Sequence, residues 1–210
     1  MKRFLLSLLI VSSFSVFAQV EISPYAGYFF GGKSDFYEGS LKINDNMNYG
    51  AHLSFNMGGG VGAELSYSLS ASSAKWNPSF QYIDRFPAQE FDINTHVFLL
   101  GGYKEIELAN ERVLGFMNLK GGAILYSPQN SNIQDVWRFL IGIGGGVKIF
   151  FNDVVGIRLQ GNMYLPMYFN GGGIYCGIGT GGSNCGASVG GTVVIFEGDL
   201  TAGLIFKLGY

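Results

Sequence analysis

A histidine, a serine and a glutamate lie close enough in the sequence to form a nucleophilic site. His52 and Ser54 are separated by one residue, and Glu64 lies in the next apolar stretch. Residues two apart on a strand point to the same face, so the His ring could activate the Ser hydroxyl while the Glu orients the ring. A His-x-Ser pair is also common by chance. The alternative is that all three are polar residues that share one face of a sheet.

Charged and amide residues recur at alternate positions within the apolar stretches. Alternation of this kind predicts strands with one apolar face and one polar face. A buried charge persists only when it is paired and hydrogen-bonded, so we expect a Glu64–Arg158 contact and a second pair between Glu21 and Lys207. The residues assigned to this inward polar network are Glu21, His52, Glu64, Asp92, Asn94, His96, Asn118, Lys120, Lys148, Arg158, Gln160 and Lys207.

Cys176 and Cys185 are the only cysteines and lie in a Gly-rich stretch near the end of the chain. An even pair in an exported chain predicts a disulfide. Closing a loop of about ten residues would contribute on the order of 2–3 kcal/mol. No His, Asp or Glu lies between the two cysteines, so we predict no metal site and no cofactor. The neighbouring glycines do not form a phosphate-binding loop, because no Lys follows them and no helix begins there.

The first 18 residues have the features of a signal peptide. Lys2 and Arg3 precede an apolar run from 4 to 17, and Val16-Phe17-Ala18 offers a cleavage site. This run is too short to span a bilayer comfortably as a helix, and no later stretch reaches the ~20 apolar residues needed. We therefore expect an exported mature domain over residues 19–210.

The composition limits the class of protein. Hydrophobic residues make up 48% and charged residues 13% of the chain, whereas soluble domains carry roughly 25% charged residues. A net charge of -2 gives no electrostatic footprint for nucleic acid. In hydrocarbon only helices and closed barrels satisfy every backbone polar group. Without a candidate spanning helix, the composition predicts an all-β membrane barrel.

Alternating stretches predict an eight-stranded antiparallel up-and-down transmembrane β-barrel. The final strand, Gly198–Tyr210, has apolar residues at every second position and is expected to pair with the first strand and close the ring. The other strands are expected at 20–30, 47–57, 61–71, 91–103, 113–126, 138–151 and 154–167. Connections at 58–60 and 152–153 are short and that at 104–112 is intermediate, whereas those at 31–46, 72–90, 127–137 and 168–197 are long. Barrels of the outer membrane alternate short periplasmic turns with long outward loops in this way.

These features resemble the small outer-membrane β-barrel family of OmpA-, OmpX- and OmpW-like proteins. Leu204, Phe206, Leu208 and Tyr210 look like the carboxy-terminal signal that such proteins show to the outer-membrane assembly machinery, although Phe is the commoner last residue. The resemblance implies a monomer in the outer membrane of a Gram-negative bacterium, in contact with lipid and lipopolysaccharide. Both termini would be periplasmic, and the outward loops could contact an extracellular ligand.

The strand pattern also assigns the outer face. Aromatic residues near strand ends could form interfacial girdles, namely Tyr25, Tyr28, Tyr67, Trp76, Tyr103, Trp137, Tyr164, Tyr168 and Tyr210, of which Tyr25 and Tyr164 fall on the inward set. The residues expected to face lipid are Leu53, Phe55, Leu65, Leu69, Val97, Leu99, Ile141, Ile143, Val147, Ile149, Ile157, Leu159, Leu204 and Phe206.

Three functions follow from these patterns. Eight strands leave a lumen just wide enough for side chains to fill, so the many inward charges favour a non-enzymatic structural or surface-interaction protein. The alternative is a small OmpW-like transport barrel for small or apolar solutes, which a continuous apolar lumen would favour. A remote alternative is an enzyme, because His52, Ser54 and Glu64 are similar to the His-x-Ser plus Glu arrangement of lipid A deacylases. In that family the motif lies late in the chain and faces lipid.

Overall fold

The computed structural model describes residues 19–208 apart from 85–86, 111, 130–132, 180–181 and 194–195. Within strands, the side chains of 35–36, 109–110 and 168–193 are not described. The predicted signal peptide and Tyr210 lie outside the described residues. The strands are β1 (Gln19–Phe30), β2 (Lys33–Phe36), β3 (Gly39–Ile43), β4 (Asn46–Asn56), β5 (Val61–Pro78), β6 (Gln89–Asn110), β7 (Val113–Pro128), β8 (Val136–Phe150), β9 (Val155–Gly179), β10 (Gly182–Val193) and β11 (Glu197–Leu208), with a 3-10 helix η1 (Phe80–Tyr82).

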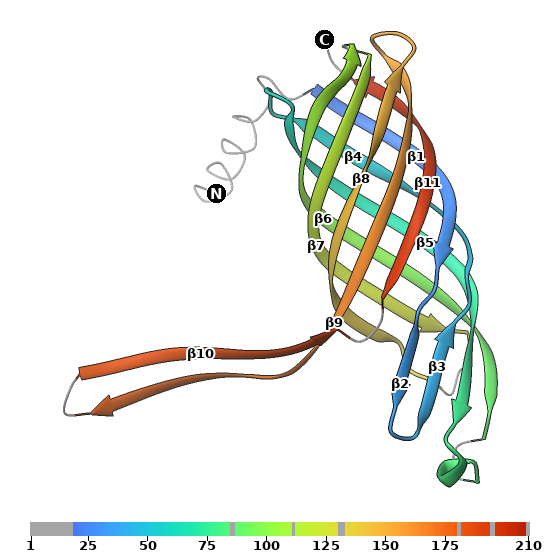
Figure 1. Ribbon diagram of the computed structural model, residues 1–210, viewed down its shortest axis with the longest axis vertical. Coiled ribbons are helices and arrows are strands. Elements are labelled where there is room, and N and C mark those ends of the chain that lie inside the picture. Colours follow the sequence, from blue (N-terminus) through green and yellow to red (C-terminus); the bar gives the residue numbers. More distant parts are fainter. Residues whose placement is uncertain are drawn as a thin grey trace, which may run out of the picture.

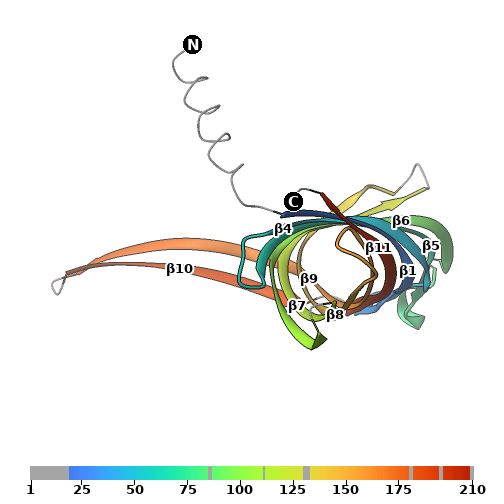
Figure 2. The ribbon, with the colours of Figure 1, turned by 90° about the horizontal axis from the view of Figure 1, so that it is seen from above.

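Eight of these strands form a closed antiparallel ring in the order β1-β11-β9-β8-β7-β6-β5-β4 (Figures 1 and 2). The first and last strands pair along their length, from Val20 opposite Leu208 to Phe30 opposite Gly198. The predicted closure of the barrel by the final strand is therefore confirmed. No helix in the described part of the chain has the length and apolarity needed to cross a bilayer.

Most strand bounds lie within a few residues of the predicted positions, and three strands run further than predicted. β5 continues to Pro78, and β9 continues to Gly179. The stretch 104–110, predicted as part of a connection, is strand, so only residues 111–112 join β6 to β7. The short hairpin β2–β3, which continues the sheet beside β5, and strand β10, which pairs only with β9, were not predicted.

The two ends of the barrel differ. We call the end that holds the short connections 57–60, 111–112 and 151–154, together with Gln19 and Leu208, the turn end. The opposite end, called the loop end, carries the β2–β3 hairpin, the η1 segment and the β9–β10 ribbon (Figure 1). Short and long connections alternate more strictly than predicted, because the connection expected at 104–112 consists only of residues 111–112.

The turn between β4 and β5 requires glycine. Gly58, Gly59 and Gly60 have φ values of 91°, 62° and 71°, which residues other than glycine rarely adopt. A Cβ at Gly59 would meet nothing within 4 Å, so a substitution there adds backbone strain and no clash.

We expect Gly59→Ala to lower the free energy of unfolding by about 1–2 kcal/mol, the cost of a left-handed conformation for a residue with a Cβ. Gly102→Ala is the matched control, since its φ is not positive and its Cβ would meet only the Gly62 carbonyl oxygen at 3.6 Å. Urea unfolding of both variants in phospholipid vesicles measures the difference. Equal effects of the two substitutions would contradict this account of the turn.

The lumen near the loop end is filled by apolar side chains. Phe29 on β1, Ile93 on β6 and Leu140 on β8 belong to one buried cluster, although they come from distant parts of the ring. The remaining members are Ile43, Ala74, Val97, Leu99, Ile124, Tyr126 and Tyr164. The outer part of the lumen is therefore lined mainly by apolar side chains, and most of the buried charged side chains lie in the middle and toward the turn end.

Candidate functional site

Glu64 is the centre of a buried ionic cluster inside the barrel. It lies on β5, four strands away from β9 in the ring, and its carboxylate accepts two hydrogen bonds from the Arg158 guanidinium at 2.5 and 3.0 Å. The Lys120 Nζ atom lies 2.5 Å from the same carboxylate. All three side chains are at most 3% exposed. The predicted Glu64–Arg158 contact is therefore present and crosses the lumen.

His52, Ser54 and Glu64 are not arranged as a nucleophilic site, because the His52 ring contacts Ser66 and not Ser54. The Ser54 hydroxyl donates to Glu64 at 2.8 Å, whereas the His52 Nδ1 atom lies 2.9 Å from the Ser66 hydroxyl. The His52 ring stacks on Tyr25 with centroids 4.5 Å apart. The three residues are at most 2% exposed and face the lumen. In this geometry they hold the Glu64 cluster together and do not reach the outer, lipid-facing surface.

A second ionic cluster lies nearer the turn end. The Lys148 Nζ atom contacts Glu21 and Glu105, each at 2.5 Å, and all three residues are buried. Lys207 lies 3.9 Å from the other oxygen of Glu21. The predicted Glu21–Lys207 pair is present, but Lys148 is the closer partner of Glu21. Because these residues lie on β1, β6, β8 and β11, this cluster also spans the ring.

Amides connect the Glu64 cluster to an aspartate further along the lumen. Arg158 Nε donates to Gln160 at 2.7 Å, and Gln160 contacts Asn162. Asn162, Asn48 and Tyr164 then donate to the Asp199 carboxylate at 2.6, 2.8 and 2.8 Å. At the loop end, the Tyr126 hydroxyl lies 3.0 Å from both oxygens of Glu197. Polar contacts therefore extend through most of the barrel and meet the apolar cluster at its outer end.

The inward assignment of Asp92, Asn94 and His96 is wrong. Along β6 the buried side chains are Ile93, Thr95, Val97, Leu99, Tyr103 and Glu105, so the even-numbered residues point outward. Asp92 is exposed, and the side chain of His96 contacts Tyr67 on the outer surface. The lumen at this level is packed with apolar side chains, and the outer wall beside Asp92 and Asn94 lies near the loop end. On this part of β6 the inward side chains are therefore mainly apolar and the outward side chains polar, the reverse of the arrangement around Glu64.

The same reversal corrects the predicted lipid face. Val97 and Leu99 are only 3% and 4% exposed and point into the lumen. The other predicted lipid-facing residues are partly or largely exposed on the outer surface. Among the aromatic residues, Tyr28, Tyr67 and Trp137 point outward. Tyr25, Tyr103 and Tyr164 point inward, so Tyr103 was also misassigned, and the side chains of Tyr168 and Tyr210 lie outside the described part.

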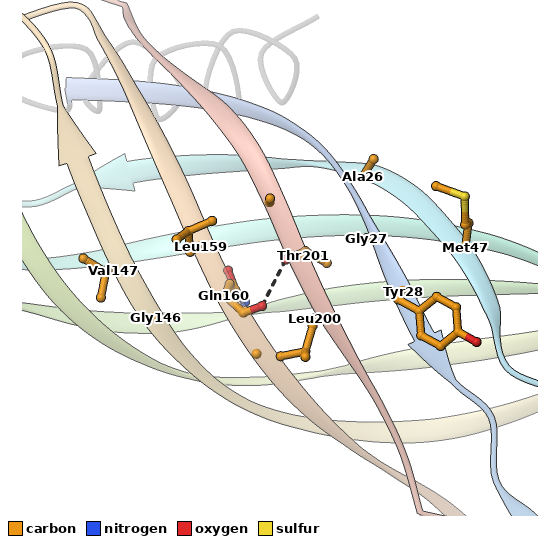
Figure 3. Close-up of a pocket in the computed structure, with 12 residues that line it drawn as sticks. Ala26, Gly27, Tyr28, Met47, Gly146, Val147, Leu159, Gln160, Leu200 and Thr201 are labelled. Carbon is orange, nitrogen blue, oxygen red and sulfur yellow. Dashed lines mark hydrogen bonds between the residues drawn. The ribbon is translucent and has the colours of Figure 1, made fainter.

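The outer surface is shallowly hollowed where the ring closes. Figure 3 shows Ala26, Leu159 and Leu200 around this hollow, which has a volume of about 930 Å³. Small residues on β1 and β11 (Ala26 opposite Ala202) form its floor, and the exposed side chains of Tyr28 and Leu200 rise beside them. Its almost entirely apolar lining matches the acyl chains of a bilayer.

The backbone of the β9–β10 ribbon brings the two cysteines opposite each other. Cys176 and Cys185 are directly paired in the antiparallel register. Cα atoms of such pairs lie about 4.5–5.5 Å apart, within the range that a disulfide bridges. Their side chains lie outside the described part, so the disulfide stays a prediction.

We expect the oxidised protein to react with no maleimide under denaturing conditions and to take up two labels after reduction, as measured by mass spectrometry. Labelling of two cysteines without reduction would contradict the predicted disulfide. Because the ribbon pairs with no other strand of the ring, we expect reduction to leave the unfolding of the barrel unchanged.

The sequence analysis missed several lumen residues. Glu105 was assigned to a connection, although it lies on β6 and pairs with Lys148. Asp199 and Glu197 have the same parity as Lys207 on the last strand, so alternation could have assigned them to the lumen as well. Among the described residues, no group of three or more His, Cys, Asp and Glu side chains is placed to hold a metal ion.

A closed ring of eight antiparallel strands, with buried ionic clusters inside and a largely apolar outer face, is the fold of the small outer-membrane β-barrels. Two solved structures agree at the level of fold. Neisserial surface protein A has 12% identity and a TM-score of 0.54, with 90% of this chain and 97% of that chain covered. The N-terminal β-barrel domain of Pseudomonas aeruginosa OprF has 12% identity and a TM-score of 0.51, also with 90% and 97% covered. No protein-family model and no curated protein sequence matches the chain.

Proposed function

We propose that this protein is a non-enzymatic integral outer-membrane barrel with a closed lumen and a structural or surface-contact role. The observation that supports a closed lumen is the pair of ionic clusters that cross it. Glu64 reaches Arg158 from the opposite side of the ring, and Lys148 joins two carboxylates from two other strands. A path for ions would have to part charges that are buried together, which costs several kcal/mol per ion.

The proposed orientation places the turn end in the periplasm and the loop end outside the cell. Short periplasmic turns and long outward loops are the rule for barrels of this class. The exposed row Leu204, Phe206 and Leu208 on β11, followed by Tyr210, would serve as the signal for outer-membrane assembly. The β2–β3 hairpin, the η1 segment and the β9–β10 ribbon would then form the surface available to an extracellular partner.

Planar-bilayer recordings test the closed lumen. We expect the refolded wild-type protein to give no discrete current steps at neutral pH, because both clusters are intact. A parallel recording with a large porin shows that insertion can be detected. Reproducible ohmic steps from the wild type would contradict the closed lumen and favour a narrow channel.

Epitope insertion tests the orientation. A tag between Ile83 and Asp84, beside η1, should bind antibody on intact cells. A tag in the turn at Gly58–Gly60 should bind only after the outer membrane is permeabilised. The reverse pattern would contradict the proposed orientation.

A second candidate, a transport barrel for small or apolar solutes, is favoured by one observation. A largely apolar cavity of about 180 Å³ lies at the loop end, lined by the β2–β3 hairpin (Leu41, Ile43) and by Phe91, Ile93 and Val136, among others. The polar clusters toward the turn end interrupt any continuous apolar path, which favours the closed barrel. Faster uptake of a labelled alkane by cells that carry the protein would support transport instead.

A further inference from the structure

The β9–β10 ribbon leaves the ring as a separate two-stranded sheet. β9 pairs with β8 only as far as Met167, and among the described residues β10 pairs only with β9. The ribbon projects sideways from the loop end and extends past the barrel wall (Figures 1 and 2). On each outer edge of such a ribbon, alternate residues direct a backbone N–H and C=O group away from the sheet. These groups are available to a further strand.

The outer edge of β10 is regular over most of its length. Residues 182–189 pair with β9 without interruption, and the register shift between Val189 and Gly191 lies nearer the barrel. Exposed strand edges accept other strands, and natural proteins protect them by keeping them short or by placing charges, Pro or bulges along them. The stretch 182–189 contains no charged residue and no Pro, and its pairing shows no bulge. This edge is therefore unprotected.

The whole ribbon differs in charge from the other edge of the sheet. Residues 168–193 contain no Asp, Glu, Lys, Arg, His or Pro. β2, which also pairs on one side only, has Lys33 and Asp35 among its four residues. Glu197, the first charged residue after the ribbon, is 3% exposed and contacts Tyr126 inside the barrel. Charge therefore accompanies the edge of β2 and is missing from the edge of β10.

A second copy of this chain fits the β10 edge. An uncharged, Gly-rich strand has few groups that select a foreign sequence, so main-chain hydrogen bonds must supply most of the contact. Copies in one membrane share an orientation, so their ribbons lie at the same height above it. A half-turn about the membrane normal reverses a strand that runs along the membrane surface and brings two β10 edges together antiparallel. Because the ribbon extends past the wall, the two barrels need not touch (Figure 2).

The outer edge of β9 is less suited to this contact. It begins beside the start of β8, where Asp135 is exposed and Arg138 is partly buried, so charges adjoin it. Pairing of β9 in one copy with β10 in the next would also be head-to-tail and would form an open chain of molecules. Pairing of β10 with β10 uses the same edge in both copies and stops at two.

We propose that the outer edge of β10 pairs antiparallel with the same edge of a second copy of this chain, joining two barrels outside the membrane. The proposal rests on the surface-contact role and the membrane orientation given above, and it names the partner of the ribbon. It differs from the monomer that the family resemblance implies.

Sedimentation equilibrium of the folded, oxidised full chain in density-matched detergent tests the proposal. We expect a reversible monomer–dimer equilibrium that salt does not weaken, because no charges lie along the edge. Ala187→Lys/Ser188→Lys should weaken the dimer about tenfold or more, since like charges then meet across the strand pair. Two adjacent positions are changed because register is weakly specified in Gly-rich strands. Ala187→Glu/Ser188→Glu should have the same effect, and a mixture of the two variants should recover a dimer that salt weakens.

Ser79→Lys/Gln81→Lys, at exposed positions beside η1, is the matched control, because it adds the same charge away from the ribbon and should dimerise as the wild type does. A monomeric wild type, unchanged dimers in the β10 variants, no recovery in the mixture, an equal loss in the control, or assemblies that grow beyond two copies would each overturn the proposal. The heat-dependent gel shift of folded barrels reports folding separately. Sedimentation in detergent does not depend on membrane orientation, so failure of the dimer is distinct from failure of the proposed function.

Discussion

Replacement of Glu64 by Gln is expected to lower the free energy of unfolding by about 3–5 kcal/mol, the usual cost of removing one partner of a buried ion pair. Arg158 and Lys120 both contact this carboxylate and are at most 3% exposed. Gln fills nearly the same volume, so the loss is electrostatic and creates no cavity. Two buried cations would then lack a counter-charge, and we expect water to enter the lumen to hydrate them.

Urea titration in vesicles, followed by the gel mobility of the folded form, measures this loss. Glu38→Gln, an exposed carboxylate at the loop end, is the matched control and should change stability by less than about 0.5 kcal/mol. Adding Lys120→Met and Arg158→Met to Glu64→Gln removes the unpaired charges and should recover much of the loss. A single Glu64→Gln variant as stable as the wild type would refute the role of Glu64 as the centre of the cluster.

The second large effect is expected for Lys148→Met, with a loss of about 3 kcal/mol or more. Lys148 is 1% exposed and lies 2.5 Å from both Glu21 and Glu105. Without it the two carboxylates repel each other inside the barrel. Lys42→Met, an exposed lysine on β3, is the control for the loss of one positive charge.

The two carboxylates should respond differently to a second substitution. Glu21 retains Lys207 at 3.9 Å, whereas the ion pair of Glu105 among the described residues is with Lys148. We therefore expect Glu105→Gln to restore more stability to Lys148→Met than Glu21→Gln does, in the same urea titration. Equal rescue by both would mean that Lys207 contributes nothing measurable to the cluster.

The strand positions and their pairing could be predicted from alternation, because one face of each strand in a membrane barrel contacts lipid and the other faces the lumen. Both predicted bounds of β1 and the predicted start of the closing strand differ from the observed positions by at most one residue. Glu64 and Arg158 could be paired in advance because a ring of eight places their strands opposite each other.

The β6 error has a specific cause. Asp92, Asn94 and His96 alternate with Ile93, Thr95 and Val97, and alternation alone identifies two faces without stating which one is inside. The polar face was assigned to the lumen because that rule holds at the level of Glu64. Near the loop end, buried Ile93 and Val97 join the apolar cluster from β1, β7 and β8 instead.

The sequence alone determined the number of membrane strands, their order and the closure of the ring, because period-two alternation and connection length are local properties of the chain. The tertiary structure decided which carboxylates share which cations, how far the strands extend past the membrane, and where the inner wall changes from polar to apolar. These depend on side chains from strands far apart in sequence meeting at one level of the lumen, and that level is set by the tilt and register of the whole barrel.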